Sequence, residues 1–403
     1  MADPGRPVLY RDAALADGRS DRLRLGVSVL VAGGRIARIR DSGDEPETER
    51  LDAVEVVDAS GGTIVPAMVD GHSHVTMPGG AHWIDRGLDE PARLIDAAER
   101  NGELLTRSGV RWARDVGAPV GADPVDGRRR ALSLGVRDRW RDRMDRPYIR
   151  AAGTWLTRAG TLPGGLGEEA SNADELLAAA IRQLDDGADL VKLYLDGPDP
   201  ESAPWSREEV ARVVDAVHAR GAKVTAHATR LDGTRAGVEG GVDAIEHGFE
   251  IDASLATEMA RRGTYLVSTL TVFTSRVTFR TTTAIPRFAS ADGARVIVER
   301  LREASESVAT AHRAGVPIAA GTDFGGGSPR AGELAWEVES LVRAGLEPWQ
   351  ALASATWRGG ELLGEPGAGV IAEGGPPDFF LVHGDPLSDP AALWRVWRVA
   401  WER

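Results

Sequence analysis

The chain has 403 residues, of which 42% are hydrophobic and 27% charged, so it is long enough for one large domain and a small one. Its net charge of −13 argues against nucleic acid and an anionic membrane surface as partners. Because there is no cysteine, disulfides and thiolate metal sites are excluded. With no signal-peptide core at its start and no apolar run near the roughly 18 residues that span a bilayer, we expect a cytoplasmic protein.

Both ends of the chain carry strand patterns. Near the amino end, short apolar segments alternate with turns, and Gly33-Gly34 is a hairpin signal. A further strand is expected at 378–382, after a stretch rich in glycine and proline. We therefore predict a small composite β-sandwich domain formed by residues 1–63 and 359–403, with the remainder of the chain inserted between them.

The inserted residues, 64–358, alternate short apolar segments with longer helical patterns, which indicates parallel βα units. The expected strands are 64–70, 110–116, 148–152, 190–195, 223–227, 244–247, 265–269 and 317–322. Helices are expected at 92–107, 174–186 and 207–220. Eight such units predict an α/β fold of the (β/α)8 TIM-barrel type, whose active site lies at the carboxyl ends of the strands. Long irregular connections, expected to surround that end, are 117–146, 153–173 and 270–289.

Two histidines one residue apart, His72 and His74, follow the first of these strands. Alternate residues of a strand face the same side, so both imidazoles can reach one metal ion. Taken alone, the pair is equally compatible with two surface histidines in a turn. Other polar residues fall at the ends of later strands, and therefore at the same end of the barrel: Lys192, His227, His247 and Asp323. Scattered surface residues would not align in this way, so we interpret the group as a functional site.

Lysine is scarce, because Lys192 and Lys223 are the only lysines among 48 basic residues. A lysine kept in so arginine-rich a chain is a candidate for chemistry that guanidinium cannot perform. Burial lowers the pKa of an amine from ~10.4, and the neutral amine can react with carbon dioxide to give a carbamate that bridges two metal ions. The alternative is a buried ion pair of Lys192, for example with Asp323. Lys223 starts its strand and is expected away from the site.

Several segments together resemble the amidohydrolase superfamily, in the branch of imidazolonepropionase-like and Xaa-Pro or Xaa-Arg dipeptidase-like metal-dependent hydrolases. These segments follow the family's order and are spread over nearly the whole chain: VDGHSHV (69–75), ARDVG (113–117), GADLVKLY (187–194), AKVTAHA (222–228), GVDAIEHG (241–248) and GTDFG (321–325). The resemblance implies two divalent ions, most simply zinc. It gives His72, His74 and Asp323 to the more buried ion. It gives His227 and His247 to the more exposed one, with carboxylated Lys192 (N6-carboxylysine) bridging the two.

The function that this resemblance implies is hydrolysis of a C–N bond in an amide, a dipeptide or a cyclic amide. A water that bridges the two ions would have its pKa lowered toward ~7. As the resulting hydroxide attacks the carbonyl carbon, Asp323 would accept the proton and then deliver it to the leaving nitrogen. The same metal site could instead serve a non-hydrolytic cyclisation, dehydration or lyase step. The complete ligand set disfavours a catalytically inactive binding protein.

Candidates for binding the small-molecule substrate lie near the ends of the expected strands. Tyr194 shares a face with Lys192 and could donate a hydrogen bond to a substrate oxygen. Arg158 and Arg230 could hold a substrate carboxylate by bidentate pairing, and His82 could line the pocket. Each of these four also has a structural or solvent-exposed role as its alternative.

The sequence departs from the family in regions that affect the substrate pocket. Many relatives carry a histidine in the connection after the third strand, whereas residues 157–165 contain none. The substrate therefore cannot be assigned to dipeptides from the sequence. The carboxyl end contains three tryptophans, Trp394, Trp397 and Trp401. We expect them to pack against the barrel or against a neighbouring subunit, and the second case would imply a homo-oligomer.

Overall fold

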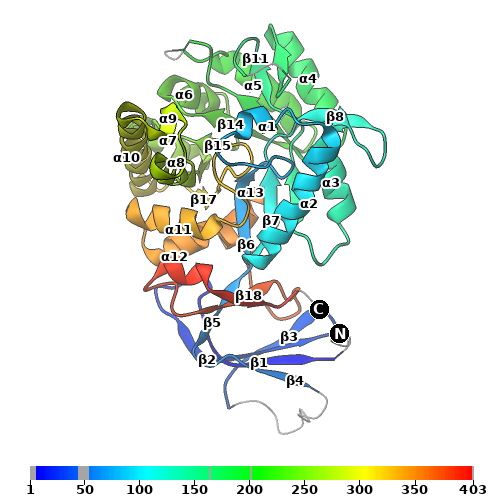
Figure 1. Ribbon diagram of the computed structural model, residues 1–403, viewed down its shortest axis with the longest axis vertical. Helices are drawn as coiled ribbons and strands as arrows, with labels where there is room; N and C mark the ends of the chain where they lie inside the picture. Colours follow the sequence, from blue (N-terminus) through cyan, green and yellow to red (C-terminus); the bar gives the residue numbers. More distant parts are fainter. Residues whose placement is uncertain (1–5, 44–53, 163–164, 200–201, 402–403) are drawn as a thin grey trace.

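The computed structural model describes residues 6–43, 54–162, 165–199 and 202–401. The molecule is elongated, with parallel strands and helices in its upper part and a sheet built from both ends of the chain in its lower part (Figure 1). The expected α/β fold is confirmed. Parts of the expected terminal domain (1–5, 44–53 and 402–403) and of the expected 153–173 connection (163–164) lie outside the described residues.

The lower sheet has the strand order β19-β18-β5-β1-β2-β3, with β4 beside β1. Its strands are β1 (Val8–Leu15), β2 (Arg24–Ala32), β3 (Arg35–Asp41), β4 (Glu55–Asp58), β5 (Gly62–Pro66), β18 (Phe379–His383) and β19 (Val396–Val399). The hairpin expected at Gly33-Gly34 joins β2 to β3, and both glycines have the positive φ that a tight hairpin turn requires. Tyr10 meets Phe379 edge to face at 5.0 Å in the core of this sheet. The two ends of the chain therefore share one hydrophobic core.

The upper part contains two parallel sheets, one of which has the order β10-β7-β6 and the other β12-β11-β13-β14-β15-β16-β17. Isolated bridges join the two sheets, between Ser73 and Phe324 and between Ala152 and Leu190. The strands are β6 (Met68–Ser73), β7 (Val110–Asp115), β10 (Tyr148–Ala151), β11 (Leu156–Arg158), β12 (Glu168–Ala170), β13 (Leu190–Tyr194), β14 (Lys223–Ala228), β15 (Ala244–His247), β16 (Tyr265–Ser268) and β17 (Ile318–Ala320).

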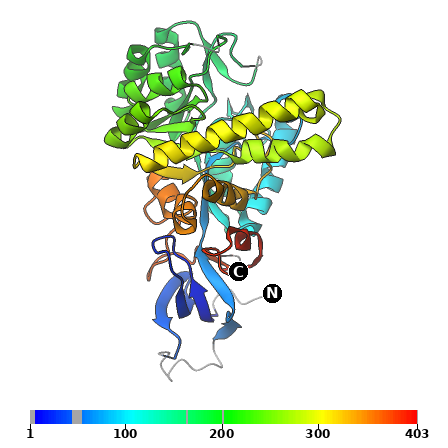
Figure 2. The same ribbon diagram turned by 90° about the vertical axis from the view of Figure 1, so that its left-hand side faces the viewer.

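Helices alternate with these strands, and the long helix α10 runs beside α8 (Figure 2). The helices are α1 (Trp83–Arg86), α2 (Pro91–Arg107), α3 (Leu132–Trp140), α4 (Ala173–Asp185), α5 (Arg207–His218), α6 (Leu231–Glu239), α7 (Ala253–Arg262), α8 (Thr271–Thr282), α9 (Pro286–Ala289), α10 (Ala291–Arg313), α11 (Leu334–Arg343), α12 (Pro348–Ser354), α13 (Trp357–Leu363) and the 3-10 helix η2 (Pro390–Trp394). The capping box at the start of α5 is present, with Ser206 and Glu209 each bonding the other's backbone amide.

The apolar run expected to form one strand at 64–70 belongs to two strands. Its first residues are the end of β5 in the lower sheet, and its last residues begin β6 in the upper part. The division falls at Pro66. Because proline has no amide hydrogen, it cannot donate a backbone hydrogen bond to a neighbouring strand. Beyond it, the amide of Ala67 donates to the carbonyl of Asp378, whereas that of Met68 donates to Gly109. Hydropathy could not reveal the division, because both strands are fully buried.

The three connections expected to be irregular contain regular elements. Residues 117–146 include a two-stranded sheet, formed by β8 (Val120–Ala122) and β9 (Arg129–Ala131), and helix α3, while 153–173 include β11 and β12. Residues 270–289 contain α8 and α9, although the threonine-rich segment has weak intrinsic helix propensity. Tertiary contact overrides that propensity, because the buried carboxylate of Glu337 accepts hydrogen bonds from the backbone amides of Leu270 and Thr271.

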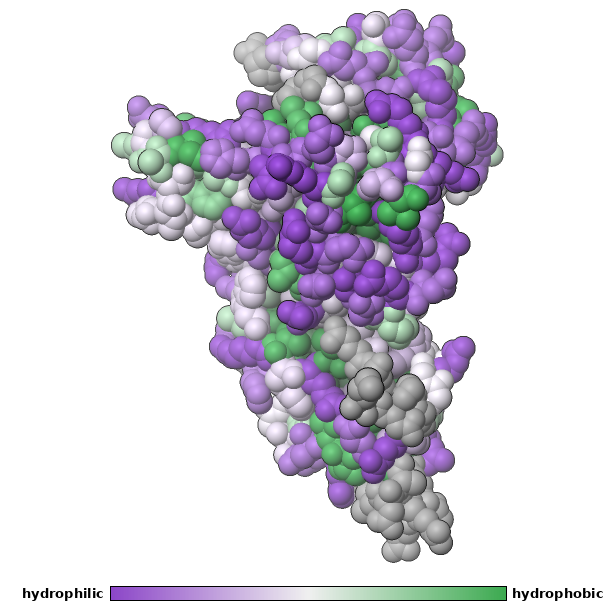
Figure 3. Space-filling view, turned by 45° about the vertical axis from the view of Figure 1, so that its right-hand side comes forward, coloured by the Kyte–Doolittle hydropathy of each residue, from purple (hydrophilic) through white to green (hydrophobic). Residues whose placement is uncertain are grey.

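The surface is mostly hydrophilic on the face shown in Figure 3, where apolar side chains gather only in small separate groups. Within the described ranges, no helix combines the length and the apolar character needed to cross a membrane.

Arg111 of β7 links the upper part to the carboxyl-terminal segment. Its buried guanidinium donates to the carboxylate of Asp378 at 3.2 Å and to the carbonyl of Arg146 at 2.6 Å. It also lies over the ring of Tyr148, 4.2 Å from the ring centroid. Burial raises the pKa of Asp378, so the ionised carboxylate depends on this arginine.

We expect Arg111→Met to lower the free energy of unfolding by about 3–5 kcal/mol, because it leaves a buried carboxylate without its partner. Urea denaturation measures the change, and the exposed Arg93 of α2 provides the control variant Arg93→Met, with an effect within about 0.5 kcal/mol. Adding Asp378→Asn to Arg111→Met should restore part of the loss. Equal stability of the Arg111 and Arg93 variants would contradict this account.

Candidate metal centre

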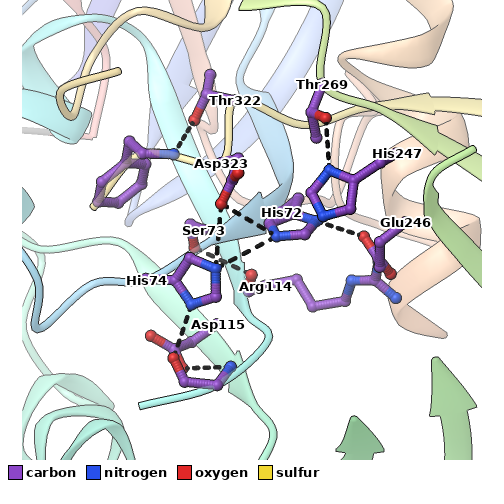
Figure 4. Close-up of polar contacts among 12 residues, drawn as sticks. His72, Ser73, His74, Arg114, Asp115, Glu246, His247, Thr269, Thr322 and Asp323 are labelled. Atoms are coloured by element: carbon purple, nitrogen blue, oxygen red, sulfur yellow. Dashed lines mark hydrogen bonds and ion pairs between the residues drawn. The ribbon is translucent and has the colours of Figure 1, made fainter. Parts of the chain in front are cut away.

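Six side chains that the sequence analysis selected as ligands line one cavity of about 250 Å³. The strands β6, β13, β14, β15 and β17 each carry at least one candidate ligand within or just beyond their carboxyl-terminal half. Figure 4 shows four of these residues, namely His72, His74, His247 and Asp323. The structure therefore brings together every member of the predicted set: His72, His74, Lys192, His227, His247 and Asp323.

Three potential ligand atoms converge in the cavity. The Nδ1 atom of His74 lies 2.7 Å from the carbonyl of Gly117, and Nδ1 of His72 lies 2.6 Å from a carboxylate oxygen of Glu246. Carbonyl and carboxylate oxygens only accept, so both Nδ1 atoms carry the proton and both Nε2 atoms present a lone pair. These Nε2 atoms lie 3.3 Å apart, and Oδ1 of Asp323 lies 3.3 Å from one and 3.2 Å from the other. Three acceptors this close together form a group that could hold a cation.

The separations fit a metal ion of the size of zinc. Ligand atoms about 2.0–2.1 Å from a tetrahedral zinc ion lie about 3.3 Å from one another. The three measured separations agree with that value. Asp323 reaches the point of convergence with a backbone φ of 56°, a left-handed conformation that non-glycine residues rarely adopt. Such backbone strain is characteristic of functional positions.

His247 adds a further ligand atom beside this trio. Its ligand atom and those of His72 and Asp323 all lie within 4.8 Å of one another. Nδ1 of His247 lies 2.8 Å from the hydroxyl of Thr269, which leaves Nε2 as the other donor atom of the ring. The backbone φ of His247 is also positive, at 74°. The structure thus contains a second strained ligand position at the same cavity.

His227 lies on the more exposed side of the cavity. Its Nε2 atom donates to the carboxylate of Asp196 at 3.1 Å, which leaves the lone pair on Nδ1. Its ring stacks on Tyr194, with the ring centroids 3.9 Å apart and the planes 10° apart. Burial opposes ionisation of Asp196, but its contacts with His227 and Thr229 lower its pKa to about 2. The carboxylate therefore fixes the orientation of the His227 ring at the cavity.

Lys192 projects its amine into this group without a partner. It is 1% exposed, and Nζ has no hydrogen-bond partner among the described residues. Burial lowers its pKa to about 8, so a substantial fraction of the amine is neutral near physiological pH. The alternative of an ion pair with Asp323 is not present within the described part of the chain.

Glu246 and Arg114 orient the ligands and were missed by the sequence analysis. Glu246 is fully buried and accepts hydrogen bonds from Arg114, from Thr225 and from the His72 imidazole. Burial raises its pKa, but Arg114 and Lys192 outweigh that effect and hold the pKa well below its usual range. Each of these charged residues stands in an otherwise apolar strand, which could have marked it as functional. Their contact with each other could not be predicted, because they are far apart in the sequence.

Of the four predicted substrate-binding residues, Tyr194 lines the cavity. The remaining three lie elsewhere on the described surface: the side chain of His82 is 68% exposed, Arg158 lies over an indole ring at 4.6 Å, and Arg230 pairs with a glutamate at 2.8 Å. Trp83, beside His82 in the sequence, does line the cavity.

Residues 63–399 match the model of the Amidohydrolase family. The chain belongs to this family. This finding confirms the resemblance that the sequence motifs indicated, and the chain is therefore a hydrolase that acts on carbon–nitrogen bonds.

Relatives match most of the amidohydrolase chain. An uncharacterized protein of Mycobacterium tuberculosis is 31% identical over 342 residues, which are 83% of this chain and 82% of the relative. The imidazolonepropionase of Anaeromyxobacter dehalogenans is 25% identical over 419 residues, covering 94% of this chain and 90% of that protein. The crystal structure of a Xaa-Pro dipeptidase with bound methionine in the active site has a TM-score of 0.81 and 24% identity, covers 97% of both chains and shares the fold.

We expect Gly326→Ala to weaken metal binding by about 10–100-fold, a loss typical of disturbed ligand support. Gly326 lines the cavity, and a Cβ atom there would overlap the His74 ring and displace it. Competition with a chromophoric chelator measures the affinity. Gly367→Ala is the matched control, because a Cβ at Gly367 meets nothing within 4 Å. Unchanged affinity in the Gly326 variant would contradict the ligand role of His74.

Proposed function

We propose that this chain is a binuclear metal-dependent amidohydrolase that cleaves an amide, dipeptide or cyclic amide bond of a small molecule. The observation that carries the proposal is the convergence of three acceptor atoms, from His72, His74 and Asp323, at one end of a cavity. Among the described residues, no contact in the cavity favours the non-hydrolytic cyclisation, dehydration or lyase alternative, and membership of the Amidohydrolase family supports hydrolysis.

The proposed metal set has two ions, most simply zinc, held by nitrogen and oxygen ligands. His72, His74 and Asp323 would hold the more buried ion, and His227 and His247 the more exposed one. The unpartnered amine of Lys192 supports a carbamate between them, because carboxylation would convert an orphaned buried amine into an anionic ligand. When bound, the ions would acidify water and polarise a substrate carbonyl.

Asp323 is the proposed general base and then general acid. Its Oδ1 atom lies 3.3 Å from Nε2 of His72 and 3.2 Å from Nε2 of His74, where a bound cation would keep the carboxylate ionised. It is therefore ionised at neutral pH, able to accept a proton from water at the cavity and to return it to the leaving nitrogen. Burial raises the pKa of Tyr194, which keeps its hydroxyl protonated as a donor to a substrate oxygen. Roles for Arg158, Arg230 and His82 stay predictions.

The proposed architecture is a closed (β/α)8 barrel, residues 64–358, with a composite β domain made of residues 1–63 and 359–403. The bridges between Ser73 and Phe324 and between Ala152 and Leu190 support closure, because they connect the two parallel sheets at two places, one beside β6 and one beside β10. A cytoplasmic location and a homo-oligomer stay predictions.

Replacing the bridging candidate tests the carbamate directly. We expect Lys192→Arg to lose activity by about a hundredfold or more and to bind fewer ions, because guanidinium cannot form a carbamate. Metal analysis, activity and thermal unfolding are measured together. Lys223→Arg is the matched control, since the Lys223 amine bonds to the carbonyl of Leu362 and lines a different pocket. A fully active Lys192 variant would refute the carbamate.

Metal removal and a substrate panel test the reaction itself. The metal-loaded protein is expected to hydrolyse at least one class among N-acyl amino acids, Xaa-Pro dipeptides and lactams, with loss after chelation and recovery with zinc. Amine release and metal content per chain are the measurements. Fewer than about one ion per chain would overturn the binuclear site. Failure on every class would favour the non-hydrolytic alternative.

A further inference from the structure

The cavity beside the proposed metal ligands has a mainly apolar wall with one further cation. Apolar side chains from several connections form that wall: Met77, Trp83, Ile84, Trp155, Leu162 and Leu166. The cation is Arg276 of α8, which also lines the cavity. The sequence analysis missed it, because it treated this segment as an irregular connection.

Arg276 has no anionic partner in the described part of the chain. Its Nε atom is buried without a hydrogen bond, and no carboxylate oxygen of the described residues lies within ion-pair distance of its guanidinium. The guanidinium lies 4.9 Å from the ring centroid of Trp83 and 5.7 Å from that of Phe273. Arg287 also lies over Trp83, at 4.8 Å, but it is exposed and donates to the carbonyl of Ala81. Arg276 thus lines the cavity with a guanidinium that forms no ion pair within the described part of the chain.

This arrangement is costly unless a ligand completes it. Burial lowers the pKa of Arg276 to about 10, which still leaves it positively charged at neutral pH. Arg276 is half-buried, and the nearby charge of Asp323 favours its charged form without forming an ion pair with it. A charge partly removed from water without a direct partner is unfavourable, and stacking on an indole compensates for only part of that cost. A carboxylate suits the planar fork of a guanidinium and can accept two hydrogen bonds from it.

We propose that Arg276 determines specificity by binding the carboxylate of an amide substrate whose bulky apolar group contacts the wall formed by Trp83, Trp155 and their neighbours. The inference rests on the proposed function, because the scissile bond of such a substrate would lie at the metal site. An acyl amino acid with a free carboxylate and an apolar or aromatic side chain has this chemistry. If Arg276 served only to support Trp83, charged and uncharged ligands would depend on it equally.

The test uses two ligands that contain no C–N bond, so that binding is measured without hydrolysis. These are 3-phenylpropionate and the uncharged 3-phenylpropan-1-ol, titrated into the metal-loaded full-length protein and followed by tryptophan fluorescence and calorimetry. We expect wild type to bind the acid at least about tenfold more tightly than the alcohol, a typical gain from a hydrogen bond to a charged group. Arg276→Gln should abolish that preference while leaving alcohol binding unchanged.

Two further variants separate a specific role from a structural one. Arg280→Gln changes an exposed arginine one turn along α8 and should behave as wild type. Arg276→Lys keeps the charge without the planar fork and should retain part of the preference for the acid, which keeps the test valid if the glutamine variant does not fold. Thermal unfolding of each variant reports its folding.

Several outcomes would overturn the inference. For Arg276→Gln, these outcomes are a retained preference for the acid or an equal loss of acid and alcohol binding. For a folded Arg276→Lys, the outcome is complete loss of the preference. For wild type, it is binding of neither ligand or equal binding of both. The proposed function fails separately. If no amide class is hydrolysed while the Arg276-dependent acid preference persists, only the reaction is wrong. If uncharged lactams are hydrolysed while the acid preference is absent, only the role of Arg276 is wrong.

Discussion

The site depends on one electrostatic constraint, which is that the lone pairs of His72 and His74 and the carboxylate of Asp323 point at a common centre. Acceptors repel one another, so the fold must hold each of them in place. Glu246 fixes the His72 ring by accepting from Nδ1, and the carbonyl of Gly117 does the same for His74. These outer contacts decide which nitrogen keeps the proton and therefore which nitrogen can bind a cation.

The outer contacts also connect the strands that carry the ligands. The carboxylate of Asp70 on β6 accepts hydrogen bonds from the backbone amide and the hydroxyl of Thr322, the residue before Asp323. Arg114 of β7 donates both to Glu246 of β15 and to the carbonyl of Gly71 on β6. Because these groups are buried, displacing one leaves another without its partner. The rigidity of the ligand geometry therefore follows from buried polar contacts between strands as well as from apolar packing.

The sequence was sufficient to predict what the strand ends carry. Short apolar segments that end in His, Lys or Asp predict which side chains line one cavity, because parallel strands bring their carboxyl ends to one side. It was insufficient where a tertiary contact decides the local structure. The run 64–70 is divided by the contacts that follow Pro66, and α8 forms from a segment rich in threonine. Arg276 could not be distinguished from other arginines, because its position at the cavity and its buried, unpaired Nε atom are properties of the folded chain.

The proposed metal ligands and the proposed specificity residue Arg276 lie on different elements of the chain. Both are nevertheless positioned by a buried carboxylate that accepts hydrogen bonds. The buried carboxylate of Glu246 orients the candidate ligand His72. The buried carboxylate of Glu337 accepts hydrogen bonds from the amide and the hydroxyl of Thr271, at the start of the helix that carries Arg276. A carboxylate at a helix amino terminus is favoured by the helix dipole as well as by its hydrogen bonds. Since α8 is fixed from its buried end, Arg276 is held in position before any ligand arrives. The Arg276 side chain therefore loses little conformational freedom when a ligand binds. This favours the binding of a carboxylate over that of an uncharged group.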